Sequence, residues 1–464
     1  MLELAQIMSD AVKSVSPKTH MGLMCGNPNT HAAEGCRWLD MVKTFSVSGN
    51  FPVLRPGYAS YQQGDTSEAS RDLSDMRKLQ PLLTHKVRFT PELENYPFTR
   101  FSKSTSLTRL QMALSFFLAG PDITLDIHSF VETRFDYDTS VDKMLDESFD
   151  FFGGLSTWSS TCPAERGLQV LWDDRFPLHR NAESNRMMAL EAPPVWEGVL
   201  DLMGFATTFY PQELKLASRT FLEERNAEEI QNLLRGKVLM DGDAASFLVE
   251  KGYGPQIGLR AIEPVAAANI ERMVNPEFAG DFLNRDETVA EASKYRLVPF
   301  EQAVIVSRML GPEGHFSVPG MVLFKNPNGG RIGVIPQNGS RGDFLLVDFR
   351  GWKRQFVLRK MLEWLNDGPL PLFVENAANI CPFRKDGNQR LLVGIANLSG
   401  DPVDELRFRA APFGSGQITV DYLDAAGKSV RIPAICATNE GSLYVRTQLD
   451  LKPLDFACLR LQPA

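Results

Sequence analysis

The sequence has few cysteines, and none of them has the spacing of a metal site or a disulfide framework. Six cysteines are spread over 464 residues without a single Cys-x-x-Cys pair. Structural zinc sites and disulfide-rich folds need such clusters. We therefore expect free thiols, no metal, no cofactor, and a reducing, cytoplasmic setting.

Long hydrophobic runs and long basic runs are also missing. No apolar stretch reaches the ~18 residues of a membrane-spanning helix. The amino-terminal stretch carries Glu3 and Asp10, unlike a signal peptide. The 49 basic and 57 acidic residues give a net charge of -8, which argues against nucleic acid or an anionic membrane as the main partner.

What remains is an ordinary globular composition, 43% hydrophobic and 23% charged, in a chain long enough for roughly two to four domains. The first 130 residues alternate apolar runs with amphipathic segments, which predicts parallel strands joined by helical crossovers. The expected strands are 20–27, 51–57, 85–95 and 123–130, and the expected helices are 1–15, 30–46, 66–83 and 106–120. In the opening helix, one apolar side is formed by Leu2, Leu4, Ile7, Met8, Val12 and Val15.

The second part of the chain changes in character. A strand at 237–242 leads into a helix for which Asp243 is the expected N-cap residue. Residues 320–337 contain an Asn-Gly-Gly turn that is typical of a β-hairpin. After a helix at 352–367, short alternating segments separated by Gly, Asn and Asp predict a small β-sandwich.

The stretch "RFTPELENYPFTRFSKS" (88–104) places two carboxylates at the end of the third expected strand. Because side chains alternate along a strand, Glu92 and Glu94 share one face. In a closed parallel barrel that face points into the mouth, where active sites lie, and the pair then suits a carboxylate nucleophile. The simpler alternative is a solvated strand end whose glutamates pair with Arg88 and Lys103. Nearby cations are Arg55, Arg100 and Lys103.

Polar and aromatic residues after neighbouring strands could complete a sugar site. Arg55 could bind a hydroxyl or keep the nucleophile ionised, and Tyr58 or Tyr61 could stack on a sugar ring; the alternative is a Pro-Gly turn with surface tyrosines. His128 could line the pocket or be an ordinary half-buried histidine. The candidate substrate-binding residues are Arg55, Tyr58, Asn95, Tyr96, Lys103, Asp126 and His128.

The segment "ELENYPFTRFSKS", a helix and then "AGPDITLDIHSF" resemble the seventh and eighth strands of clan A glycoside hydrolases. The resemblance is nearest to the trimeric family 42 β-galactosidase-like enzymes. In that family a Glu followed by a loop with Pro is the nucleophile, so the resemblance assigns this role to Glu94, with Glu92 as the alternative.

The same resemblance implies an architecture for the whole chain. Residues 1–150 would be strands five to eight of a (β/α)8 TIM-type barrel. Residues 151–375 would be a flavodoxin-like α/β domain of the kind used for trimer contacts, and 376–464 a β-sandwich domain. The implied activity is that of a retaining exo-β-glycosidase acting on a terminal sugar of a glycoside or oligosaccharide.

The chain departs from the family in its acid/base residue. The family needs a second carboxylic acid on strand four, usually preceded by Asn, and no Asn-Glu dipeptide occurs before Glu92. Strands one to four have no counterpart, so we expect a missing or partner half-barrel to supply this group. The partners would then be a homo-oligomer (trimer) or a hetero-assembly. The alternative is a non-catalytic carbohydrate-binding or oligomerisation subunit, and galactose, mannose, glucose and fucose all stay open as the sugar.

Overall fold

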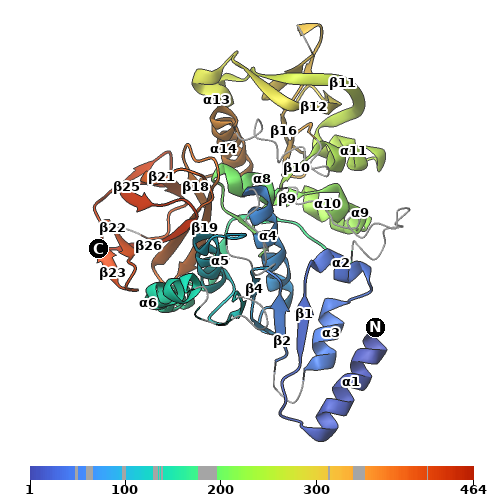
Figure 1. Cartoon of the computed structure of the whole chain (residues 1–464). Helices are drawn as coiled ribbons and strands as arrows, with labels where there is room; N and C mark the ends of the chain where they lie inside the picture. Colours follow the sequence, from blue (N-terminus) through green and yellow to red (C-terminus); the bar gives the residue numbers. More distant parts are fainter. Residues whose placement is uncertain are drawn as a thin grey trace.

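The computed structural model describes residues 1–46, 51–58, 66–96, 101–128, 134, 136, 139–175, 196–311, 314–337, 351–414 and 416–464. It is a mixed α/β protein with several sheets and a β-rich carboxy-terminal region (Figure 1). All six cysteines are free thiols, and five of them are buried. Within the described residues, none of the helices has the length and apolar character to cross a bilayer.

The first part of the chain forms consecutive parallel strands with helices between them. Its elements are α1 (Leu2–Val15), β1 (Gly22–Cys25), α2 (Pro28–Ala33), α3 (Trp38–Phe45), β2 (Val53–Pro56), α4 (Thr66–Leu83), β3 (Arg88–Phe89), β4 (Glu92–Glu94), α5 (Thr105–Leu118) and β5 (Thr124–Asp126). β1 pairs with β2, β2 with β3 and β4 with β5, all in parallel, and a parallel bridge joins Gly57 to Glu92. The third expected strand is divided into β3 and β4 at Pro91, which has no backbone N–H for the ladder.

The two faces of these strands have different surroundings. Leu54, Leu93 and Ile127 are buried and pack among apolar residues of α3, α4 and α5. The opposite face is open: Met24 is 69% exposed there, and its register partner in the parallel pair is Arg55. Side chains that alternate with the buried ones therefore point to an uncovered surface.

One of the two expectations for the amino-terminal helices is wrong. The expected amphipathic helix is formed as α1; Leu4, Ile7 and Met8 of its apolar side are each more than half exposed, whereas Ala5 and Ser9 pack towards α3. The helix expected over 30–46 is divided into α2 and α3. Between them the chain turns at Gly35, whose φ of 94° lies in the left-handed region that favours glycine.

The middle part is built around a mixed sheet. Its elements are β7 (Leu168–Val170), α8 (Glu197–Leu200), η3 (Asp201–Met203), β8 (Thr207–Thr208), β9 (Leu214–Ala217), α9 (Arg219–Glu223), α10 (Ala227–Leu234), β10 (Lys237–Met240), α11 (Gly242–Glu250), α12 (Gly254–Ile257), β13 (Val304–Ile305), β16 (Val322–Lys325), β17 (Arg331–Val334) and α14 (Trp352–Asn366). The parallel strands have the order β8-β7-β9-β10-β17. The sheet continues with β16, which pairs antiparallel with β17, and with β13, which pairs antiparallel with β16. In chain order the parallel strands are 2-1-3-4-5, the order of flavodoxin-like sheets.

Within this part, one sequence prediction is confirmed and another is wrong. The hairpin expected at 320–337 is formed by β16 and β17. The N-cap of α11 is Asp241, not Asp243, because the Asp241 side chain accepts a hydrogen bond of 2.8 Å from the Ala244 amide. Tyr295 instead donates a hydrogen bond to the Asp243 carboxylate.

A second, antiparallel sheet projects from the middle part at the top of Figure 1. Its strand order is β12-β11-β14-β15. The elements of this region are β11 (Leu259–Met273), α13 (Pro276–Ala279), η4 (Gly280–Phe282), β12 (Asp286–Pro299), β14 (Ser307–Leu310) and β15 (Ser317–Pro319). The buried carboxylate of Glu271 ties β11 to two neighbours, accepting hydrogen bonds from Ser307 at 2.5 Å and from Arg354 of α14.

The carboxy-terminal part is two packed antiparallel sheets, as the alternating segments predict. Its strands are β18 (Leu372–Val374), β19 (Ile380–Gly387), β20 (Arg390–Asn397), β21 (Val403–Ala410), β22 (Ile418–Leu423), β23 (Ser429–Arg431), β24 (Ala434–Asn439), β25 (Ser442–Leu451) and β26 (Asp455–Pro463). One sheet has the order β18-β21-β25-β24, and the other is β23-β22-β26-β20-β19-β6, where β6 is Ala164–Arg166. Through β6 and the long helix α6 (Ser140–Thr161), this part is packed onto the first.

Candidate active site

The carboxylates that the sequence singles out lie at the C-terminal ends of parallel strands. Glu94 is the register partner of Asp126, Glu92 that of Thr124, and Gly57 bridges to Glu92. Partners in parallel strands project to the same face, and so do residues two apart in a strand. Arg55, Glu92, Glu94 and Asp126 therefore share the open face of the sheet.

Glu92 is held by an arginine from the neighbouring strand. The Arg55 Nη1 atom lies 3.1 Å from the Glu92 Oε1 atom, and the Glu92 side chain is only 14% exposed. Burial raises the pKa of Glu92; Arg55 opposes this shift, and the carboxylates of Glu94 and Asp126 add to it. The net result is a pKa above the ordinary value, because one guanidinium does not offset burial and two like charges.

Lys103 is the second cation near these carboxylates, and it lies inside the protein rather than on the open face. Its side chain is buried, and its Nζ donates a long hydrogen bond of 3.5 Å to the Glu94 carbonyl oxygen. Burial lowers the pKa of Lys103 to about 8, although attraction to Asp72 and Glu94 acts in the opposite direction. The Glu94 carboxylate itself has no ion pair within the described part of the chain.

The pairing of the glutamates with Arg88 is not found. Arg88 makes a two-pronged ion pair with Asp122, with both N–O distances 2.7 Å, at the other end of the strands. The simpler alternative, in which Arg88 and Lys103 neutralise the two glutamates, is therefore wrong for Arg88. Lys103 contacts the carbonyl oxygen of Glu94 rather than its carboxylate.

Two of the candidate substrate-binding residues, Tyr58 and Asn95, do not lie on the open face of the sheet. Tyr58 is 2% exposed and lies in the apolar core with Leu93, so it cannot stack on a sugar as expected. Burial raises its pKa well above the ordinary value. The side-chain amide of Asn95 donates to Thr108 of α5 at 3.2 Å, so it fixes the loop after β4.

The remaining candidates lie at the rim of the open face. Tyr96 is 54% exposed directly after Glu94 and Asn95. His128 follows β5, and its Nε2 lies 3.0 Å from the Asp142 Oδ1 atom of α6. Sequence reasoning missed Asp142 and Asp122, because nothing in either segment shows which distant side chain each carboxylate will contact. Tyr61, Pro97 and Arg100 lie outside the described residues.

Within the described residues, His, Cys, Asp and Glu side chains form no group suited to a metal ion. The described part of the candidate site contains carboxylates, Arg55 and the rim side chains. Such a set can act by nucleophilic or acid–base chemistry, and it can hydrogen-bond hydroxyl groups.

Comparison with known proteins gives a structural likeness without a sequence match. No family model matches the sequence, and no curated protein matches it. A β-galactosidase from Rahnella sp. R3 superposes with a TM-score of 0.59 at 12% identity, over 96% of this chain and 66% of that one.

Two other glycoside hydrolases give similar values. A GH42 β-galactosidase from G. stearothermophilus has a TM-score of 0.57 at 12% identity, covering 99% of this chain and 68% of the other. The α-L-fucosidase isoenzyme 2 from Paenibacillus thiaminolyticus has a TM-score of 0.57 at 10% identity, with 92% and 70% covered. The chain thus spans about two thirds of the length of each of these proteins, and over that length it shares the fold of these glycoside hydrolases, as the resemblance implied.

Proposed function

We propose that residues 1–150 are strands five to eight of a (β/α)8 barrel, followed by a flavodoxin-like domain (151–375) and a β-sandwich (376–464). Three observations support this: consecutive parallel pairing, helices on one face, and an open face opposite them. In a closed barrel the open face would be the interior, and its C-terminal rim would be the active site.

We further propose that this rim belongs to a retaining exo-β-glycosidase. The observation that carries the proposal is the placement of Glu92, Glu94 and Asp126 on one open face at the C-terminal ends of neighbouring strands, with Arg55 paired to Glu92. The glycosidases that share this fold make a carbohydrate the expected substrate class.

Glu94 is the proposed nucleophile. Glu92 already forms an ion pair with Arg55. Glu94 is the last residue of β4, and its carboxylate has no ion pair within the described residues. Glu94 would attack the anomeric carbon as the leaving oxygen departs. Tyr96, Asp126 and His128 are placed to contact sugar hydroxyls or a ring, and Glu92 is the alternative nucleophile.

The proton donor would come from a half-barrel outside these residues. A retaining mechanism needs its carboxyl group about 5 Å from the nucleophile. An uncovered surface is present where such a partner would dock: the exposed apolar stripe of α1 (Leu4, Ile7 and Met8) and Met24 of β1 lie on neighbouring elements of the chain. A trimer or a hetero-assembly would supply this cover.

The nucleophile can be tested without the proton donor. 2,4-Dinitrophenyl 2-deoxy-2-fluoro-β-glycosides have a leaving group that needs little acid assistance, and the fluorine slows hydrolysis of the covalent intermediate. We expect one chain to gain one fluorosugar by intact mass, with the modified peptide containing Glu94. The galactose, glucose and mannose forms should each be tried.

Glu94→Gln should abolish the labelling, while the matched variant Glu92→Gln should keep it. Both variants should melt within a few degrees of the wild type, because both side chains are partly exposed. Labelling of Glu94→Gln, or a modified peptide elsewhere in the chain, would remove Glu94 from this role. Binding of the sugar without any labelling would favour the non-catalytic carbohydrate-binding alternative.

A further inference from the structure

A second cavity lies between the middle part and the β-sandwich, remote in sequence from the candidate active site. Its volume is about 230 Å³. One wall is the first half of α14, the second is the end of β18 with Arg409 of β21, and the third is η4. The lining includes Phe282, Trp352, Phe356, Arg359, Glu375 and Arg409, with Phe373 buried in the wall.

The cavity has an aromatic platform that is open to solvent. Trp352 is 60% exposed. Phe282 packs edge-on against it, with ring centroids 4.9 Å apart and an interplanar angle of 88°, and Phe282 also packs edge-on against Phe356 at 5.4 Å. These contacts fix the rings although the tryptophan is exposed. An exposed, oriented indole beside polar groups is a surface on which the apolar face of a sugar ring can stack.

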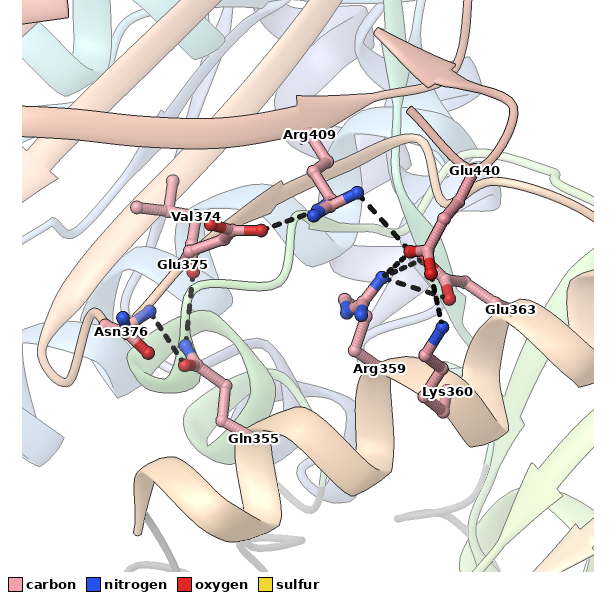
Figure 2. Close-up of polar contacts among 9 residues, drawn as sticks. All are labelled: Gln355, Arg359, Lys360, Glu363, Val374, Glu375, Asn376, Arg409 and Glu440. Carbon is pink, nitrogen blue, oxygen red and sulfur yellow. Dashed lines mark hydrogen bonds and ion pairs between the residues drawn. The ribbon is translucent and has the colours of Figure 1, made fainter. Parts of the chain in front are cut away.

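The polar groups of the cavity are held in place by ion pairs. Figure 2 shows Arg409 and Arg359 approaching from opposite walls and meeting at the carboxylate of Glu440, at 3.5 Å and 3.2 Å. Arg409 also donates to Glu375 at 2.5 Å, and Lys360 lies 3.0 Å from Glu440. Hydrogen bonds from Lys360 and Arg359 lower the pKa of Glu440, so it stays ionised near neutral pH.

The loop that presents Glu375 is fixed by a buried amide. The Gln355 Nε2 atom donates to the Met203 carbonyl oxygen at 2.6 Å. Figure 2 shows its other two contacts: Nε2 donates to the Val374 carbonyl oxygen at 3.2 Å, and Oε1 accepts from the Asn376 amide at 3.0 Å. Asn376 has a φ of 55° and an exposed side chain. The donors and acceptors of the cavity are thus ordered without a ligand.

The charged groups that line the cavity balance. They are two carboxylates, Asp281 and Glu375, and two guanidinium groups, Arg359 and Arg409. Behind the lining, Arg359 also pairs with Glu363 and Glu440, and Lys360 pairs with Glu440. A large excess of either sign would attract a charged ligand, and this cavity has none. Hydroxyl groups both donate and accept hydrogen bonds, so a neutral polyol can satisfy arginine donors and carboxylate acceptors at once.

We propose that this cavity is a second carbohydrate-binding site, which takes a neutral monosaccharide unit stacked on Trp352 with its hydroxyls on Glu375 and Arg409. The volume is below the ~300–1,000 Å³ of sites for drug-sized ligands, which suits one sugar unit better than an oligosaccharide. None of the lining residues belongs to residues 1–150, so this site is independent of the proposed glycosidase rim.

Binding can be measured on the full chain by isothermal titration calorimetry with four neutral probes. These are methyl β-D-galactopyranoside, methyl β-D-glucopyranoside, methyl α-D-mannopyranoside and methyl α-L-fucopyranoside. We expect at least one of them to bind with a Kd on the order of 1 mM. Trp352→Ala should weaken that binding at least ~10-fold, and Trp352→Phe should recover part of it because an aromatic face is kept.

Three comparisons decide the outcome. Phe149→Ala, which removes another exposed aromatic ring, should leave the Kd unchanged, and so should Glu94→Gln. Glu375→Gln should weaken binding, since it removes a charged acceptor but keeps the shape. If none of the probes binds, or if Trp352→Ala binds as the wild type does, the second site is refuted. Loss of binding in Glu94→Gln alone would place the sugar at the barrel rim and leave the proposed glycosidase intact.

Discussion

The buried side chain of Lys103 makes the stability of the folded chain depend on pH. Burial lowers its pKa from 10.5 to about 8. Between these values the unfolded chain holds a proton that the folded chain lacks, so stability rises as the pH increases through this window. Below pH 8 the folded protein carries the full cost of the buried charge. The shift corresponds to about 3 kcal/mol.

We therefore expect Lys103→Met to remove this rise. The difference in free energy of unfolding between the wild type and Lys103→Met should change by about 3 kcal/mol from below pH 8 to above pH 10.5, measured by urea unfolding. Lys143→Met removes a lysine that is 74% exposed and should follow the wild type at every pH. Parallel pH profiles for Lys103→Met and the wild type would show that the lysine is not buried as described.

Sequence reasoning succeeds at this scale where the cause is local. The shared face of Glu92 and Glu94 follows from alternation along one strand, and the proximity of Glu92 to Arg55 follows from parallel pairing. The interior position of Tyr58 does not follow, because it depends on how α4 and α5 cover the strand end. The partner of His128 comes from α6, so no local pattern could identify Asp142.

At the scale of elements, periodicity predicts which segments are helices or strands better than it predicts what covers them. The spacing of apolar residues in α1 correctly indicates an amphipathic helix. Its apolar side is nevertheless exposed, because none of the described elements packs there. Capping is similarly ambiguous in "DGD", where Asp241 and Asp243 are equally suitable by type. Only the backbone path shows which carboxylate meets the free amides of α11.

Helix α4 is attached to the rest of the molecule by a buried arginine. Arg77 is 1% exposed, and its guanidinium lies 2.8 Å from Glu165 and 3.4 Å from Asp201. Arg77→Met would leave these carboxylates buried without that cation, which typically costs about 3–5 kcal/mol. Arg88→Met breaks the exposed pair with Asp122 and should cost far less, because solvent screens an exposed ion pair.

Urea unfolding of the two variants at pH 7 would measure this difference. The comparison is matched, since both changes replace an arginine of the first part of the chain by methionine. A loss of less than ~1 kcal/mol for Arg77→Met would contradict the buried role that the structure gives it.

At the scale of the whole molecule, the order of elements is retained where residue identity is not. The likeness to solved glycosidases holds at 10–12% identity, because parallel strands with crossover helices constrain the order of elements more than the side chains. Sequence reasoning therefore predicted the likeness to glycoside hydrolases. It did not predict the cavity around Trp352, since four separate segments, at 281–282, 352–359, 373–376 and 409, have to meet to form it.

The uncovered surfaces of the first part should make the chain self-associate when the proposed complementary half-barrel is absent. Leu4 and Ile7 are each 61% exposed on α1, and among the described strands β1 and β5 each have one neighbour. Exposed apolar surface and open strand edges both favour association. We expect species larger than the 51.8 kDa monomer in sedimentation velocity, with a proportion that increases with concentration.

The double variant Leu4→Lys/Ile7→Lys should shift this distribution towards the monomer, because two charges would then have to be buried in any contact through α1. Val430→Lys/Ile435→Lys makes the same change at exposed positions of the β-sandwich and should sediment as the wild type does. Equal association in all three proteins would mean that the contacts lie elsewhere, for instance in the middle part, and that the apolar side of α1 needs no cover. A wild type that stays monomeric at every concentration would remove the physical reason for a complementary half-barrel at this surface.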